Sequence, residues 1–254
     1  SRIVWFTERM HQGHMEYTIL SRGVQQQFAS LPEVAALGRT IDTDALYYSG
    51  ISQGGICGAT VMSLTRDITR GHLGVPGMNY NLLLERSVDF NPYLSVIMIN
   101  YPDRFQTPVI MEMMHLLWQK VDPVTHYRHI TVEPFPETPA HHVLLAQAQY
   151  DYQVAPLTNE IAARSNVGVA LMEHYGRDVD LVTPQSYPHN GSGLINYNFG
   201  DPWAPPGNIP PEEHENGDPH SKPRRQAHHN EQMVHFLRTG EIIDVCGGDE
   251  CTPE

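Results

Sequence analysis

The chain carries the sequence YYSGISQGGICG at residues 47–58, and this segment gives the clearest indication of the fold class. An apolar run precedes it, glycines lie two positions before and two positions after Ser52, and a series of small residues follows. This order is typical of a strand, a sharp turn and a helix. We therefore predict a buried strand at 45–48, the turn at Ser52 and a helix over 54–65.

A serine on such a turn has a chemical consequence. Small neighbours let the strand and the helix approach closely, and the turn aims the hydroxyl outward. The backbone N–H of Gln53 can then donate to a developing oxyanion, and the helix N-terminus adds positive potential. We predict Ser52 as a nucleophile and Gln53 as an oxyanion-hole donor. The alternative is a glycine-rich turn around an inert serine.

Outward from this turn, apolar runs alternate with helical patterns. Such alternation predicts an α/β fold with a mostly parallel sheet and flanking helices. The predicted helices cover residues 1–30, 54–65, 156–165 and 225–238, and the further predicted strands cover 73–76, 142–148 and 194–197. On helix 1–30 the residues expected to face the core are Ile3, Phe6, Met10, His14, Tyr17, Leu20 and Val24.

The organisation divides into three parts. Residues 1–76 hold the N-terminal helix and the turn, 77–135 form a helical insertion, and 136–254 complete the core. The insertion is rich in methionine and aromatic residues. Adaptable apolar side chains of this kind suit an apolar substrate, so Met78, Tyr80 and Trp118 are candidate substrate-binding residues. The alternative is that they form an ordinary core.

YYSGISQGGICG resembles the nucleophile elbow of the α/β-hydrolase superfamily, and its general appearance is closest to secreted bacterial esterases and lipases. The resemblance spans about residues 46–240 and implies a triad in the order serine, acid, histidine.

The implied acid is Asp151, in a D-x-x-V-x-P pattern after strand 142–148, although this carboxylate could instead cap the next helix. The implied base is His220, in the loop before the last helix, with His189 as the main rival. His228 and His229 are expected on a solvated helix face.

The resemblance also implies strands and a loop in front of Ser52 that this sequence does not show. In that fold about four strands precede the elbow, and a loop among them supplies the second oxyanion donor. Here about fifty mostly helical residues precede it. We therefore expect this chain to be the C-terminal part of a larger hydrolase, or to pair with a separate N-terminal segment that completes the fold.

Composition excludes several classes of function. The net charge of −13 argues against binding to nucleic acid or to an anionic membrane surface. No apolar stretch approaches the roughly 20 residues of a membrane span. No histidine, cysteine or carboxylate spacing indicates a metal site, and no cofactor is expected.

Three cysteines bear on the compartment. Cys246 and Cys251 are separated by four residues, including two glycines, which predicts a small disulfide loop and a secreted or periplasmic protein. The alternative is two free thiols in a cytosolic protein.

These features predict a serine hydrolase that cleaves carboxylic esters through an acyl-enzyme intermediate. Two alternatives stay open: a prolyl-peptidase-like serine peptidase, and a catalytically inactive binding module with the same fold.

Overall fold

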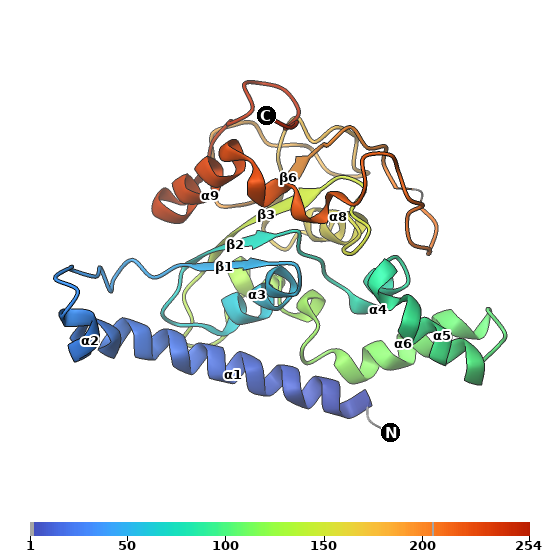
Figure 1. The fold of residues 1–254 in the computed structure, drawn as a ribbon, viewed down its shortest axis with the longest axis horizontal. Coiled ribbons are helices and arrows are strands. Elements are labelled where there is room, and N and C mark those ends of the chain that lie inside the picture. The colour runs from blue at the N-terminus through green and yellow to red at the C-terminus, as the bar shows by residue number, and fades with distance from the viewer. Residues whose placement is uncertain (1–2, 205) are drawn as a thin grey trace.

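The computed structural model describes residues 3–204 and 206–254, and it is organised around a parallel sheet (Figure 1). Five strands are hydrogen-bonded in the order β1-β2-β3-β6-β4, every neighbouring pair being parallel. These strands are β1 (Tyr48–Ile51), β2 (Arg70–Gly74), β3 (His142–Ala148), β4 (Val169–Leu171) and β6 (Ser192–Tyr197). A separate antiparallel pair consists of β5 (His189–Asn190) and β7 (Glu241–Ile242).

The predicted α/β class is confirmed, because helices flank this parallel sheet. The helices are α1 (Ile3–Gln27), α2 (Pro32–Ala35), α3 (Gln53–Leu64), α4 (Tyr80–Leu84), α5 (Asn91–Asn100), α6 (Gln106–Trp118), α7 (Arg128–Thr131), α8 (Leu157–Arg164) and α9 (Ala227–Thr239). Helices α4 to α7 lie between β2 and β3 in the chain, where a helical insertion was expected.

Strand β3 shows why the sheet is covered on both faces. Side chains alternate along a strand, and a strand buried on both faces reads as a continuous apolar run. Val143 and Leu145 pack in one cluster with residues of α3 and α8. Leu144 and Ala146 pack in a second cluster with Phe236 of α9. Accordingly, α3 and α9 lie on opposite sides of the sheet (Figure 1).

The observed strands differ from the predicted ones in their limits, and one of them was not predicted. The first strand begins at Tyr48 rather than at residue 45, so it runs directly into the turn at Ser52. Strand β4 was not predicted because it is only three residues long. Strand β6 was expected as a short strand in a long loop, but it is fully buried between β3 and β4.

Helix α1 turns only part of the predicted face inward: His14 is buried as expected, but most of the predicted apolar residues are not. Its buried residues are Thr7, His14 and Ser21, spaced seven apart. The predicted core residues Tyr17 and Leu20 are 38% and 62% exposed. The helix packs against α3 and α6, its buried residues form a narrow polar stripe, and apolar side chains such as Ile19 stay exposed.

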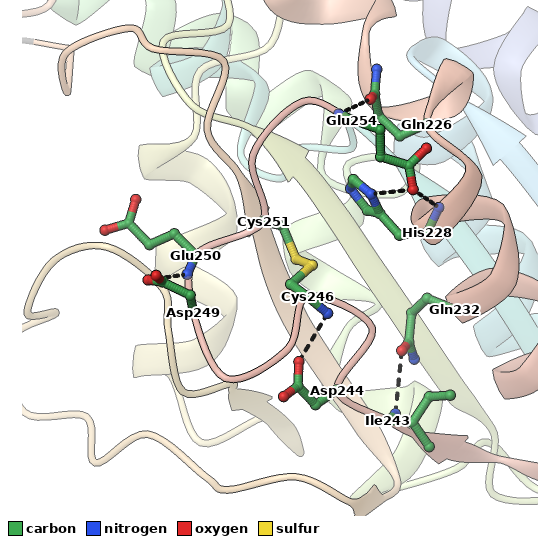
Figure 2. Close-up of a disulfide and its surroundings, with 10 residues drawn as sticks. All are labelled: Gln226, His228, Gln232, Ile243, Asp244, Cys246, Asp249, Glu250, Cys251 and Glu254. Carbon is green, nitrogen blue, oxygen red and sulfur yellow. Dashed lines mark hydrogen bonds and ion pairs between the residues drawn. A yellow bond between two sulfur atoms is a disulfide. The ribbon is translucent and has the colours of Figure 1, made fainter.

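The C-terminal tail is held by the predicted disulfide between Cys246 and Cys251 (Figure 2). Cys251 also forms a β-bridge with Tyr197, and its carbonyl oxygen accepts a hydrogen bond of 2.7 Å from the N–H of Asn198. The tail is thereby fixed against the end of β6. Among the described helices, none has the length and hydrophobicity needed to cross a membrane.

Candidate active site

Ser52 lies where β1 ends and α3 begins, in a strained backbone conformation. Its φ is 59° and its ψ is −125°. A residue with a side chain adopts such a conformation at a cost of about 1–3 kcal/mol, so the surroundings must enforce it. Two hydrogen bonds do so: the N–H of Ser52 donates to Gly74 at 2.9 Å, and its carbonyl accepts from Ile56 at 2.9 Å.

The glycines around the turn are not equivalent. A methyl group at Gly50 would collide with the carbonyl oxygen of Gly54, and one at Gly55 would lie 2.6 Å from the carbonyl oxygen of Gly74. A methyl group at Gly54 would meet no atom within 4 Å. The close approach of strand and helix therefore requires Gly50 and Gly55. The sequence pattern G-x-S-x-G had indicated Gly50 and Gly54, so it was right for Gly50 and wrong for Gly54.

Asp151 and His220 lie in contact, as their predicted roles require. Asp151 follows the carboxyl end of β3, and His220 follows β6 in the loop before α9. The His220 Nδ1 atom lies 2.8 Å and 3.0 Å from the two carboxylate oxygens. Both side chains are buried. Asp151 also accepts N–H groups of Gln153 and Val154, so it orders its own loop as well.

A residue that the sequence did not single out joins these two loops. The Asp218 carboxylate accepts hydrogen bonds from the backbone N–H of His220 at 3.0 Å and of Tyr152 at 3.3 Å. It also accepts from the Gln153 side chain at 2.7 Å. Asp218 thus fixes the His220 loop relative to the Asp151 loop.

The electrostatics of the pair favour a protonated imidazole. Burial opposes the charge on His220, but the hydrogen bond and the negative charge of Asp151, with Asp218 nearby, more than offset it. The pKa of His220 is consequently raised above its ordinary value. Because Nδ1 contacts Asp151, Nε2 is the nitrogen that remains to accept a proton.

Ser52 lies near this pair without contacting it through a hydrogen bond. His220 and Ile51, the residue before Ser52, line the same small cavity. In the described part of the chain, the Ser52 hydroxyl makes no hydrogen bond to His220 in this structure. Catalytic hydrogen bonds are often long in a ligand-free site and shorten when substrate binds.

His189 is placed at the other end of the sheet. His189 lies close to His142, the first residue of β3. Both side chains border Gly191: a methyl group there would be 3.3 Å from His189 Nε2 and 4.0 Å from His142 Nδ1. Asp151 follows the opposite end of this seven-residue strand, about 20 Å away. The geometry therefore favours His220 over His189 as the partner of Asp151.

Gln53 begins α3, so its N–H is among the helix N–H groups that lack a partner inside the helix. This position suits the predicted oxyanion donor. Its side chain donates to the Tyr80 hydroxyl at 2.8 Å, which links the turn to α4.

Met78, Tyr80 and Trp118 are 1%, 4% and 7% exposed and pack in the hydrophobic clusters. The alternative of an ordinary core therefore fits these three residues better than a substrate-binding surface does.

An apolar hollow of about 320 Å³ adjoins the turn instead. It lies between α1 and α3, and the residues that line it include Met10, Tyr17, Tyr48, Gln53, Gly54 and Val61. The sequence did not reveal it because Met10 and Tyr17 were expected to face the core.

Two buried histidines lie behind the candidate site. The rings of His72, on β2, and His229, on α9, meet edge to face at 5.0 Å. His72 Nδ1 is 3.1 Å from the Ser49 hydroxyl oxygen. His229 is 3% exposed and His228 is 8% exposed, so the prediction of a solvated helix face was wrong for both. The reason is that this face of α9 packs on β2 and Tyr197.

Among the described residues, one cluster has side chains of the types that bind metal ions, but its cysteines are not free to do so. That cluster joins His228 to Cys246 and Cys251, whose sulfur atoms are already bonded to each other.

Comparisons of the chain with protein-family models, with curated proteins and with solved structures find no match.

Proposed function

We propose that this chain is the catalytic part of a serine esterase of the α/β-hydrolase type, with Ser52, His220 and Asp151 as its triad. The observation that carries the proposal is the buried contact between Asp151 and His220, on the side of the sheet where β1 delivers a strained serine. Carboxyl ends of parallel strands meet at one edge, which is where open α/β sheets bind ligands.

In the proposed reaction, His220 Nε2 accepts the Ser52 proton while Oγ attacks the ester carbonyl. The tetrahedral oxyanion is stabilised by the Gln53 N–H. His220 then gives the proton to the departing alcohol, which leaves an acyl-enzyme. Water, deprotonated by His220, attacks the acyl carbon and releases the acid, with the proton returning to Ser52.

The hollow between α1 and α3 supports an ester with an apolar group. Its lining contains more apolar than polar surface and includes Gln53, the proposed oxyanion donor. The acyl or alcohol part of a substrate held at Ser52 can therefore rest against Met10 and Tyr17. The disulfide supports an oxidising compartment, so we propose that the protein is secreted or periplasmic.

The proposal includes a further polypeptide segment that pairs with β1. Within the described chain, β1 has a strand on one side only. Nearby helices expose apolar side chains, among them Ile19 and Leu20 of α1. Uncovered edge strands and apolar patches are usually covered by a partner. Slow hydrogen exchange at all β1 amides of the isolated chain would show that the edge is already protected, and would remove the reason for a partner.

Turnover of esters tests the chemistry. We expect short p-nitrophenyl acyl esters to be hydrolysed faster than an aminoacyl-proline amide, and Ser52→Ala to lose at least about 10³-fold in kcat. Ser49→Ala, three residues earlier on β1, should keep most of the activity. Equal activity of Ser52→Ala and the parent would exclude the scheme, and preference for the prolyl amide would favour the peptidase alternative.

A further inference from the structure

A second cavity lies between the start of α8 and the loop that follows β6. Its volume is about 240 Å³, below the usual range for drug-sized ligands. None of the residues proposed for catalysis lines it. The lining includes Arg86, Pro156, Leu157, Arg177, Trp203 and Ile209.

The walls of this cavity are mainly apolar, and the aromatic wall is held rigidly. The Trp203 ring stacks on Tyr175 at 5.4 Å, with an angle of 30° between the rings. The Arg177 guanidinium lies 4.1 Å from the centre of the Trp203 ring. A ligand in this cavity would therefore meet a fixed apolar surface with cationic groups at its border.

The two arginines differ in how their charge is balanced. Arg177 Nε donates to the Glu160 carboxylate at 2.9 Å, so its charge is compensated. Arg86 donates only to neutral oxygens: Leu82 at 2.9 Å, Pro206 at 3.3 Å and the Asn208 side chain. No carboxylate among the described residues forms an ion pair with Arg86. Arg86 thus lacks a direct ion pair, although the Glu85 carboxylate attracts it electrostatically, in a protein whose net charge is −13.

Glu85 is the acidic group that precedes Arg86 in the chain and interacts with it electrostatically. Its carboxylate accepts from the Asn208 amide, so it approaches Arg86 through that side chain. Burial raises the pKa of Glu85, while the Asn208 hydrogen bond and the positive charge of Arg86 oppose this rise. Glu85 therefore acts on Arg86 at a distance and leaves its guanidinium without a carboxylate in direct contact. The N-terminal end of α8, at Pro156 and Leu157, adds partial positive charge on the other side.

We propose that this cavity binds a small monocarboxylate with a compact apolar body, such as an aromatic acid. The carboxylate pairs with Arg86, and the apolar body packs against Trp203, Leu157 and Ile209. A single arginine without an ion-pair partner favours a monoanion over a phosphate dianion, and the apolar walls favour a ring or a branched chain. The site does not require Ser52 or His220, so it stands or falls independently of the proposed esterase activity.

Titration calorimetry with benzoate, benzamide and phenyl phosphate tests this site, with Trp203 fluorescence as a second signal. Benzoate should bind saturably, and benzamide and phenyl phosphate should each bind about tenfold more weakly or worse. Arg86→Gln should weaken benzoate by about tenfold or more, and Arg86→Lys by less. Arg104→Gln, at an exposed arginine, and Ser52→Ala should leave benzoate affinity unchanged.

Equal affinities for benzoate and benzamide would overturn the proposed role of charge, without relying on any variant. Absence of saturable benzoate binding would overturn the site itself. Tighter binding of phenyl phosphate than of benzoate would overturn the assignment to a monocarboxylate.

Discussion

At the scale of single residues, the turn at Ser52 requires a glycine at only one of the two positions that flank the serine in the G-x-S-x-G pattern. Gly50 faces the carbonyl oxygen of Gly54 across the turn, whereas Gly54 faces open space. The signature glycine after the serine is therefore replaceable in this chain as far as folding is concerned, and the one before it is not.

Gly50→Ala should lower the free energy of unfolding by at least about 2 kcal/mol, because the overlap forces β1 and α3 apart. Gly54→Ala should stabilise by about 0.5–1 kcal/mol, since alanine restricts the unfolded chain in a helical position that accepts it. Urea unfolding of the two variants measures both values. Similar losses in the two would show that the turn is not packed as described.

The contact between Asp151 and His220 predicts a pH dependence. In the proposed mechanism, His220 acts as the base only when its imidazole is neutral, and Asp151 helps raise the His220 pKa. Activity should therefore fall as pH decreases through an apparent pKa above about 6.5. Asp151→Asn should move this limb to lower pH and reduce kcat by about 10⁴-fold. A profile that moves to higher pH in this variant would contradict the assigned roles.

At the scale of elements, two loops from different strands must be held together. Asp218 does this through the backbone of His220 and Tyr152. Asp218→Ala should lower kcat by about 10²-fold with little change in KM, since displacing a catalytic group by about 1 Å costs this much. Asp178→Ala, at an exposed aspartate, serves as the control. A loss confined to KM would mean that Asp218 contacts substrate instead of positioning His220.

The predictability of each element follows from its surroundings. Strand β3 was predicted with its correct limits because both of its faces are buried, which gives it the apolar run from Val143 to Ala146. Strand β4 is too short for such a pattern. The inward face of α1 was predicted correctly at His14 and wrongly at Tyr17 and Leu20, because a periodicity of apolar residues does not reveal whether the chain itself covers them. Asp151 and His220 were predicted from a resemblance, whereas Asp218 acts through backbone contacts that leave no sequence pattern.

At the scale of the whole molecule, histidines buried as neutral groups should make the fold sensitive to acid. Burial lowers the pKa of His72 to about 3, and that of His229 to about 4, with each also lowered by a neighbouring histidine. Between these values and about 6.5, the unfolded chain binds protons that the folded chain does not. The free energy of unfolding therefore falls as pH decreases through this window.

His72→Gln should reduce this dependence by up to about 1.4 kcal/mol per pH unit, the contribution of one proton. Urea unfolding at several values between pH 4 and pH 6.5 measures the slope, all values lying inside the window set by the two histidines. An identical slope in His72→Gln and the parent would show that His72 is not buried as a neutral group.

The sheet, the turn and the buried Asp151–His220 pair together support the proposal that Ser52 is an activated nucleophile. Reaction with a fluorophosphonate, followed by intact mass and peptide mapping, tests it most directly. We expect one adduct per chain, located at Ser52, absent from Ser52→Ala and formed far more slowly in His220→Ala. Labelling at another residue, or an equal rate in His220→Ala, would contradict the claim.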